Sequence, residues 1–183
     1  MIKHSEQRVG VLVDVANMYH SAKNLFGSRL NFKAMLDAAV GGRRLTRAIA
    51  YAIKSDSEEE VSFFEALDKS GFEVKTKDLQ IFSSGAKKAD WDVGIAIDAV
   101  TLASKVDVIV LVTGDGDFIP LVEYLQMRGL LVEAIGFGET TSGGLKAAVD
   151  DYIDLSSDKR QYLMRSRLAM KAKTDSKTKT ETP

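Results

Sequence analysis

The chain has 183 residues, of which 45% are hydrophobic and 28% charged, the balance of a globular domain with a sizeable core. It contains no cysteine, which excludes disulfide bonds, thiolate metal sites and cysteine nucleophiles. No stretch approaches the roughly 18 apolar residues of a spanning helix, and the polar N-terminus lacks the apolar region of a signal peptide. We therefore expect a soluble cytoplasmic protein with no membrane partner.

The net charge of −1 conceals a basic C-terminal segment. Residues 158–183 carry eight lysines and arginines against three acidic residues, so the preceding part of the chain is net acidic. Because phosphate neutralisation dominates affinity for nucleic acid, an acidic RNA-binding domain needs local basic patches and a metal to offset its carboxylates. We predict one domain over residues 1–155 and a basic tail over residues 156–183, partly helical and then disordered.

Short β-branched segments alternate with amphipathic ones along the chain, which predicts an α/β fold. Asn31 and Ser57 are suitable helix N-caps, and Gly41, Gly71 and Gly129 are well placed to end helices. The alternation favours a Rossmann-like three-layer sandwich, in which a mostly parallel sheet carries helices on both faces. Strands are expected at residues 9–15, 46–53, 72–82, 108–113, 131–137 and 152–155, and helices at residues 31–40, 57–70, 91–104, 117–128 and 142–149.

Residues 9–13 and 108–112 are almost wholly apolar, as is typical of central strands buried on both faces. Ligands of such sheets bind beyond the carboxyl ends of the strands, where strand order reverses. Asp14 follows the first of these strands, and a buried carboxylate is costly without a partner. Asn17 comes one helical turn later. Asp14 therefore either caps the next helix or belongs to a functional site.

The other central strand is followed by Thr113-Gly-Asp115-Gly-Asp117-Phe. The two glycines permit a tight turn and the close approach of a ligand. Pro120 fits the first turn of a helix, which indicates Asp117 as the N-cap and leaves Asp115 without a capping role. Capping therefore explains at most one of these two carboxylates.

A third set of carboxylates comprises Asp90, Asp92 and Asp98. At 100° per residue, Asp92 falls in the apolar arc with Ile95 and Ala99, whereas Asp98 is expected to face solvent. Asp90 is expected to be the N-cap. We therefore favour Asp92 over Asp98 as a functional residue.

Carboxylate clusters without histidine or thiolate partners suit Mg²⁺ or Mn²⁺. Such ions activate water and stabilise the attacking and leaving oxygens in phosphodiester cleavage. Repulsion between converging carboxylates raises their pKa values in the absence of the ion, so metal binding should stabilise the domain.

Three segments together resemble the NYN domain family, and within it the bacterial LabA-like branch. They are Val-Asp14-Val-Ala-Asn17-Met-Tyr, Lys88-Ala-Asp-Trp-Asp92-Val-Gly-Ile-Ala-Ile-Asp98-Ala, and the motif from Thr113 to Phe118. Their order and spacing match the family over about residues 8–155. The resemblance implies a PIN-like fold with central strand order 3-2-1-4-5, and metal-dependent cleavage of RNA.

The same resemblance implies roles for individual residues. Asn17 would orient Asp14 or contact substrate, and Asp98 matches an aspartate common in this branch, which counts against a solvent-facing position. The metal ligands and catalytic residues would be Asp14, Asp92, Asp115 and Asp117.

Other polar residues admit two interpretations each. Lys87 and Lys88 either follow an RNA backbone or lie in a solvated loop. The polar run at residues 138–144 either binds a phosphate through backbone N–H groups near Ser142 or is a capped surface loop. Trp91 is either buried beneath its helix or stacks on a base. We assign Asn17, Lys88, Thr113 and Ser142 to substrate binding. The arginines at positions 43, 44 and 47 form a second basic cluster; they flank a turn, and the alternative is that they only face solvent.

Two other functions are alternatives to a ribonuclease that acts on single-stranded RNA. A regulatory module of the same fold would bind RNA or a protein without turnover, and EDTA would distinguish it from a metal-dependent enzyme. A haloacid dehalogenase-type phosphatase needs a second aspartate two residues after the first, where this chain has Ala16. The sequence leaves the oligomeric state open, a homo-oligomer included.

Overall fold

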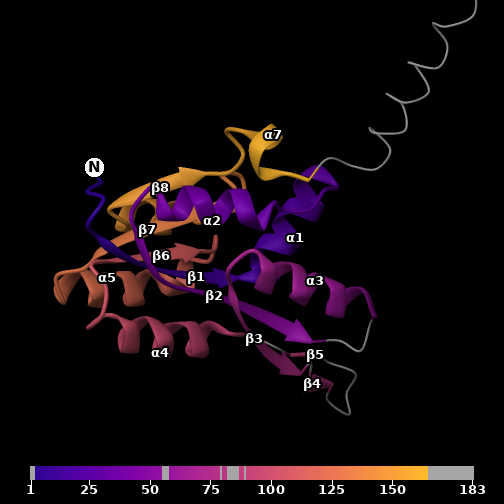
Figure 1. The fold of residues 1–183 in the computed structure, drawn as a ribbon, viewed down its shortest axis with the longest axis horizontal. Coiled ribbons are helices and arrows are strands. Elements are labelled where there is room, and N and C mark those ends of the chain that lie inside the picture. The colour runs from indigo at the N-terminus through magenta and orange to yellow at the C-terminus, as the bar shows by residue number, and fades with distance from the viewer. Residues whose placement is uncertain (1–2, 55–57, 79, 82–86, 89, 165–183) are drawn as a thin grey trace, which may run out of the picture.

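The computed structural model describes residues 3–54, 58–78, 80–81, 87–88 and 90–164 (Figure 1). Its centre is a six-stranded sheet in which all neighbouring strands are parallel. The order is β3-β2-β1-β6-β7-β8, so the expected α/β fold and the 3-2-1-4-5 arrangement of five strands are confirmed, and a sixth strand extends the sheet. The strands are β1 (Arg8–Asp14), β2 (Arg44–Lys54), β3 (Glu73–Asp78), β6 (Val108–Val112), β7 (Leu131–Gly136) and β8 (Asp151–Asp154).

Helices cover both faces of the sheet, as Figure 1 shows. One face carries α1 (Val15–Phe26), α2 (Phe32–Val40), α3 (Glu58–Lys69) and the short α7 (Lys159–Tyr162). The other carries α4 (Asp92–Leu102), α5 (Ile119–Met127) and α6 (Gly143–Ala148), with the 3-10 helix η1 (Gly116–Phe118) before α5. A small antiparallel pair, β4 (Gln80–Ile81) and β5 (Lys87–Lys88), lies outside the main sheet.

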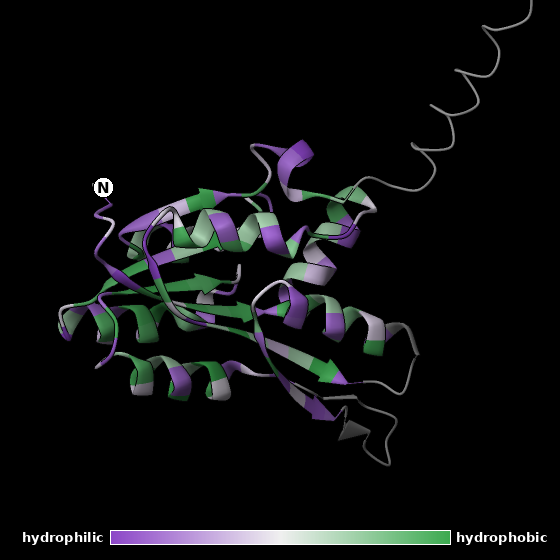
Figure 2. Ribbon diagram, viewed as in Figure 1, coloured by the Kyte–Doolittle hydropathy of each residue, from purple (hydrophilic) through white to green (hydrophobic). Residues whose placement is uncertain are grey.

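The central strands supply both hydrophobic cores because successive side chains point to opposite faces. Val11 and Val13 of β1 join the core beneath α1 and α2, whereas Leu12 joins the core beneath α4 and α5. Figure 2 shows the resulting run of hydrophobic residues through the middle of the sheet. Gly10 lets α4 approach closely, since a Cβ there would lie 2.5 Å from Leu102 Cδ2.

The helix-end signals at Asn31, Gly41, Gly71 and Gly129 were confirmed. Asn31 caps α2 by accepting a hydrogen bond from the Ala34 N–H at 3.1 Å. Gly41, Gly71 and Gly129 all adopt positive φ, where a side chain would be strained. The expected cap Ser57 lies outside the described residues.

The arginine cluster at positions 43, 44 and 47 is not an open basic patch. Arg43, which was expected near solvent, is buried and pairs through both terminal nitrogens with Glu133 of β7. The neighbouring arginines are exposed but pair with Glu6 and Glu73. The three arginines therefore form ion pairs that connect separate parts of the chain, and Arg43 does so from a buried position.

The chain remains packed beyond Leu155. Tyr162 is buried, and its carbonyl accepts the Asn31 N–H at 2.7 Å. The Met164 N–H donates to the Arg29 carbonyl at 2.8 Å, so the last described residues lie against the end of α1. Within the described ranges, no helix is long and apolar enough to cross a membrane.

Candidate active site

The candidate site lies at the carboxyl ends of β1 and β6, the two central strands. They are adjacent and in register from Val9 opposite Val108 to Val13 opposite Val112, as predicted. Asp14 is the last residue of β1, and the segment that starts at Thr113 follows β6 directly. The fold therefore brings Asp14 and the segment that carries Asp115 and Asp117 to one edge of the sheet.

Asp14 has both a structural partner and acidic neighbours. Its Oδ1 accepts a hydrogen bond from the Asn17 N–H at 3.0 Å, which caps α1. Burial raises the pKa of Asp14, and the nearby charges of Asp92 and Asp115 raise it further. The capping interpretation is thus confirmed, while the second carboxylate oxygen is not used by the cap.

Asn17 connects the two halves of the site. Its side-chain oxygen accepts a hydrogen bond from the Gly114 N–H at 3.0 Å. The first turn of α1 is therefore tied to the loop after β6, and the side chain that was expected to orient Asp14 positions Gly114 instead.

The capping roles predicted for Asp115 and Asp117 are reversed. Asp115 caps η1, because its Oδ1 accepts the Asp117 N–H at 2.9 Å, while the Asp115 N–H donates to Thr113 Oγ1 at 3.2 Å. The reason is the extra 3-10 turn: it makes Phe118 the N-cap of α5 and places Pro120 in the first turn of that helix. Asp117 is consequently exposed and lines a cavity between α4 and α5.

The polar run before α6 is a capped loop packed on this acidic turn. The Ser142 N–H donates to the Gly114 carbonyl at 2.9 Å, and Ser142 Oγ accepts the Leu145 N–H at the head of α6. Thr141 donates to the Phe137 carbonyl. A Cβ on Gly114 would lie 2.9 Å from the Thr140 carbonyl oxygen, so this position tolerates only glycine without movement. The loop interpretation of this segment is the better supported.

Asp92 is the first residue of α4 and lines the same cavity as Asp117. The helix starts after Trp91, with no side-chain cap, so the expected cap at Asp90 was wrong. Trp91 is half-buried and its Nε1 donates to the Ala52 carbonyl at 2.9 Å, which fixes the helix start over β2. Burial raises the pKa of Asp92, and Asp115, Asp90 and Asp117 add to this effect.

Asp98 belongs to a separate network and does not face solvent as the helical wheel predicted. It accepts hydrogen bonds from Tyr51 Oη at 2.7 Å and from Lys75 Nζ at 2.6 Å. The prediction failed because α4 lies over β2 and β3, whose side chains reach the flank of the helix. Burial opposes ionisation of Asp98, but these two hydrogen bonds outweigh it and lower its pKa.

Two lysines of β3 were missed as functional candidates. Lys77 Nζ lies 4.7 Å from the centre of the Trp91 ring, donates to the Asp90 carbonyl, and offsets a small part of the rise in the pKa of Asp92. Lys75 and Lys77 are separated by one residue, so both point to the same face of an edge strand, a period that could have indicated them. Lys88 lies in β5, and its side chain lies outside the described residues, as does that of Lys87.

The NYN domain profile matches residues 8–157, which include the complete sheet and all four candidate aspartates. The chain belongs to the NYN domain family. This family is PIN-like and associated with ribonuclease activity, so membership implies RNA as the class of substrate.

Two relatives place the chain within this family. It is 29% identical over 167 residues to the low amplitude and bright protein LabA of Synechococcus elongatus, which covers 85% of this chain and 87% of LabA. The crystal structure of a protein of unknown function from Vibrio parahaemolyticus superposes with a TM-score of 0.81 at 33% identity, covering 90% of this chain and all of the other. The LabA-like resemblance read from the three motifs is confirmed.

NYN-type nucleases typically use divalent metals. Within the described part of this chain, no group of three or more histidine, cysteine, aspartate or glutamate side chains is arranged closely enough to hold a metal alone. The donor chemistry nevertheless fits Mg²⁺, which commonly takes one or two carboxylates and completes its shell with water and substrate phosphate. The acidic cluster is therefore suited to bind a cation together with substrate.

Proposed function

We propose that this chain is a metal-dependent endoribonuclease that hydrolyses single-stranded RNA. The observation that carries the proposal is the proximity of Asp14, Asp92 and Asp115: burial raises the pKa of the first two, and the charges of their acidic neighbours raise it further. The ion pairs between described residues include neither these three nor Asp117. Carboxylates that repel one another in this way are held ionised by a divalent cation.

The residues that would hold the ion are Asp14, Asp92, Asp115 and Asp117. Capping engages Oδ1 of Asp14 and Oδ1 of Asp115, which leaves the second oxygen of each outside the cap bond. When bound, Mg²⁺ or Mn²⁺ supplies neutralisation of phosphate charge and activation of water for phosphodiester hydrolysis.

The chain's own contribution is to fix the acidic residues before substrate arrives. The two caps set the orientation of Asp14 and Asp115, and Thr113 holds the backbone of Asp115. The hydrogen bond between Asn17 and Gly114 keeps the two strand ends together. Preorganisation of this kind is a large part of catalysis, because no reorganisation is then needed during the reaction.

The surroundings favour an extended single strand over a buried small molecule. Asp117 is exposed and Asp92 is half-exposed, so the site is open and suits attack within a chain. Lys77 lies beside Asp92 and can pair with a phosphate of the same strand. We retain Lys88 as a proposed phosphate contact, and water as the nucleophile, since the chain has no cysteine.

One observation favours a non-catalytic RNA- or protein-binding module as the second candidate. Asp14 and Asp115 both cap helices, so a protein without activity would still need them for its stability. Turnover is therefore the property to measure.

The test is cleavage of a labelled unstructured RNA by purified protein in Mn²⁺. Asp92→Asn and Asp115→Asn should each lower the rate at least about 100-fold, the order of losing one strong electrostatic contact. Asp37→Asn is the matched control, because Asp37 is exposed on α2, on the opposite face of the sheet, and pairs with Lys33 at the surface. Equal cleavage by wild type and Asp115→Asn would identify a contaminating nuclease and support the binding module.

A further inference from the structure

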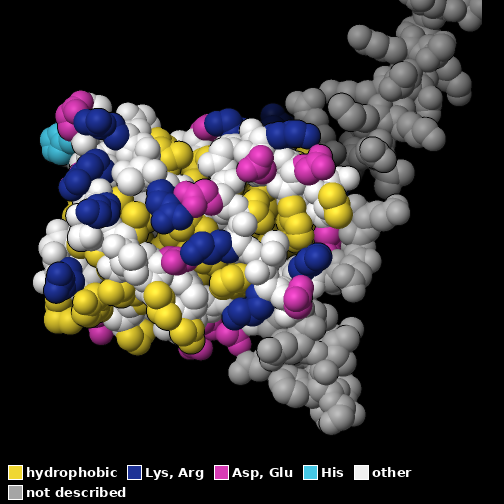
Figure 3. Space-filling model, turned by 60° about the horizontal axis from the view of Figure 1, so that its bottom comes forward, with side chains coloured by type: hydrophobic (Ala, Val, Ile, Leu, Met, Phe, Trp, Pro, Cys, Tyr) yellow, Lys and Arg dark blue, Asp and Glu magenta, His cyan; other side chains and the backbone are white. Residues whose placement is uncertain are grey.

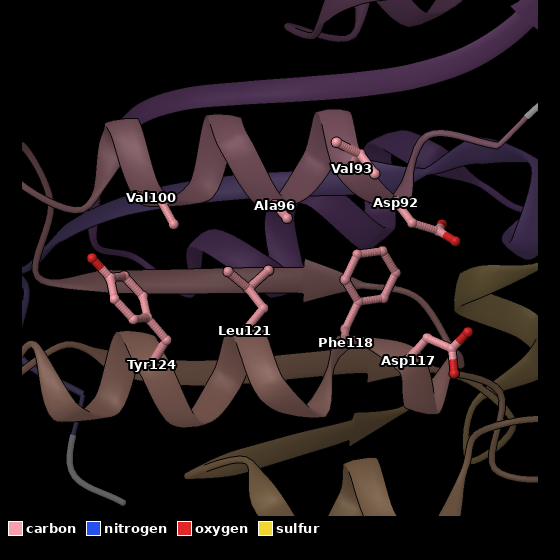
Figure 4. Close-up of a pocket in the computed structure, with 8 residues that line it drawn as sticks. All are labelled: Asp92, Val93, Ala96, Val100, Asp117, Phe118, Leu121 and Tyr124. Atoms are coloured by element: carbon pink, nitrogen blue, oxygen red, sulfur yellow. The ribbon is translucent and has the colours of Figure 1, made fainter.

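A cavity of about 380 Å³ extends from the acidic site between α4 and α5. Figure 4 shows two matched rows of side chains, with Asp92 and Asp117 facing each other at one end. Behind them the walls are hydrophobic, and the far end is formed by Val100 and Tyr124. We call this cavity the α4–α5 slot; it is lined by Asp92, Val93, Ala96, Val100, Asp117, Phe118, Leu121 and Tyr124.

The width of the slot comes from Ala96. Residues 92, 96 and 100 are spaced by four and so lie along one face of α4, opposite Leu121 of α5. Because alanine has only a methyl group, it leaves space where the other positions carry larger side chains. The slot is therefore an open groove lined on both sides by hydrophobic side chains, a surface that suits the face of a flat group.

The chemistry of the lining restricts what can enter. Among the described residues that line the slot, none is basic, so a phosphate gains no ion pair there. Oxygens of the two carboxylates at the mouth that do not hold the ion accept hydrogen bonds from N–H or O–H donors. The expected occupant is an uncharged flat ring with polar hydrogens near one end.

We propose that the α4–α5 slot binds a nucleobase of the RNA strand adjacent to the phosphate held at the acidic site. This inference rests on the proposed function, because it takes RNA as the substrate. The slot shares Asp92 and Asp117 with the acidic site, so a base in the slot lies within one nucleotide of that site. Unstacked bases in single strands bind to hydrophobic and aromatic side chains in this manner.

The rim of the slot is also hydrophobic. Val93, Ile97 and Met127 are 70%, 60% and 79% exposed, and Figure 3 shows hydrophobic side chains gathered at the lower left of that view. Exposed patches of this kind also occur at protein interfaces. The continuity of the slot with the acidic residues favours the base, and a second copy of the chain on this rim is an outcome that the experiment detects.

The experiment compares binding of a short unstructured RNA with binding of an abasic chain of the same length and charge. Fluorescence anisotropy in Ca²⁺ gives both affinities. Wild type should prefer the base-bearing chain by roughly tenfold, within the range of one base–aromatic contact. Ala96→Leu fills the slot and should remove the preference, while affinity for the abasic chain stays the same.

Ala38→Leu is the matched control, since Ala38 is also a half-buried helical alanine but lies on α2, on the other face of the sheet. It should keep the preference. Tyr124→Ala and Tyr124→Phe give a second pair that does not depend on the folding of Ala96→Leu, because Tyr124 is 37% exposed. The alanine variant should lose much of the preference and the phenylalanine variant should retain it.

The outcomes distinguish a failure of the base-binding proposal from a failure of the proposed nuclease function. A wild type that cleaves RNA in Mn²⁺ but binds both chains equally would overturn the slot and leave the proposed function intact. A base preference removed by Ala96→Leu, in a protein without cleavage, would support the slot and overturn the nuclease. If Ala96→Leu changes sedimentation from dimer to monomer and keeps the base preference, the slot is a protein interface and the proposal is overturned.

Discussion

The side-chain oxygen of Asn17 accepts a hydrogen bond from the Gly114 N–H at 3.0 Å, and this contact joins the start of α1 to the loop that carries Asp115. Asn17→Ala should leave the Gly114 N–H without its partner and lower the free energy of unfolding by about 1–3 kcal/mol. Urea denaturation of the metal-free protein measures the change. An unaltered midpoint would mean that the loop is held by its contact with Ser142 alone.

Divalent metal should stabilise the folded protein. Millimolar Mg²⁺ or Mn²⁺ should raise the melting temperature by selective binding to the folded state. Asp14→Asn should reduce that rise and at the same time stabilise the metal-free protein, because asparagine still caps α1 while the buried charge is removed. Identical melting curves with and without metal would contradict a metal site.

The raised pKa values of Asp14 and Asp92 give the metal-free protein a specific pH dependence. In the folded state these carboxyls retain protons at a pH at which the same carboxyls in the unfolded chain have lost them. The free energy of unfolding therefore increases as the pH falls from the raised pKa of the folded state to the ordinary pKa of aspartate. Asp14→Asn removes this contribution. Its stabilising effect should therefore be largest near pH 7 and shrink towards pH 4, the ordinary range of aspartate. Urea titrations of wild type and variant at each pH give the difference, and a constant gap would show that Asp14 does not titrate in this window.

Asp98→Asn separates structure from catalysis. Asparagine keeps an acceptor for Tyr51 but loses the charge that pairs with the partly exposed Lys75, so stability should fall by at most about 1 kcal/mol. Cleavage should remain far above that of Asp92→Asn. A variant that folds normally and is as inactive as Asp92→Asn would place Asp98 in the reaction.

The segment after Met164 should contribute charge to RNA binding. It contains six lysines and arginines against two acidic residues. Truncation after Met164 retains the contacts of Tyr162 and Met164 with the domain, so the melting temperature should not change. RNA affinity should fall, most strongly at low salt, and the slope of log affinity against log salt should become shallower. Equal slopes for both proteins would show that the segment does not contact RNA.

The fold followed from the sequence because each strand had a strong local signal. Residues 108–112 form an uninterrupted apolar run that belongs to a doubly buried strand, and β6 is buried at all five positions. Helix α1 was not among the expected helices, because its start signal is Asp14, which serves as a cap and is also a candidate site residue.

The details of the site depended on contacts that local patterns do not contain. A helical wheel identified Asp92 but could not include Tyr51 and Lys75, which reach Asp98 from two other strands. Pro120 correctly indicated a helix start, yet the additional 3-10 turn that moved the cap to Asp115 depends on the packing of Gly114 and Gly116 against the loop before α6. Arg43 was misplaced for the same reason, because its partner Glu133 lies on a distant strand.

The strand order also determines when the site can form during synthesis. Asp14 is on the first strand of this sheet to be synthesised, but β6 pairs with both β1 and β7, so the turn that carries Asp115 is seated only after later strands have emerged. A nascent chain thus carries separate acidic segments and no assembled cluster. The acidic cluster therefore assembles only after the strands on both sides of β6 have been synthesised.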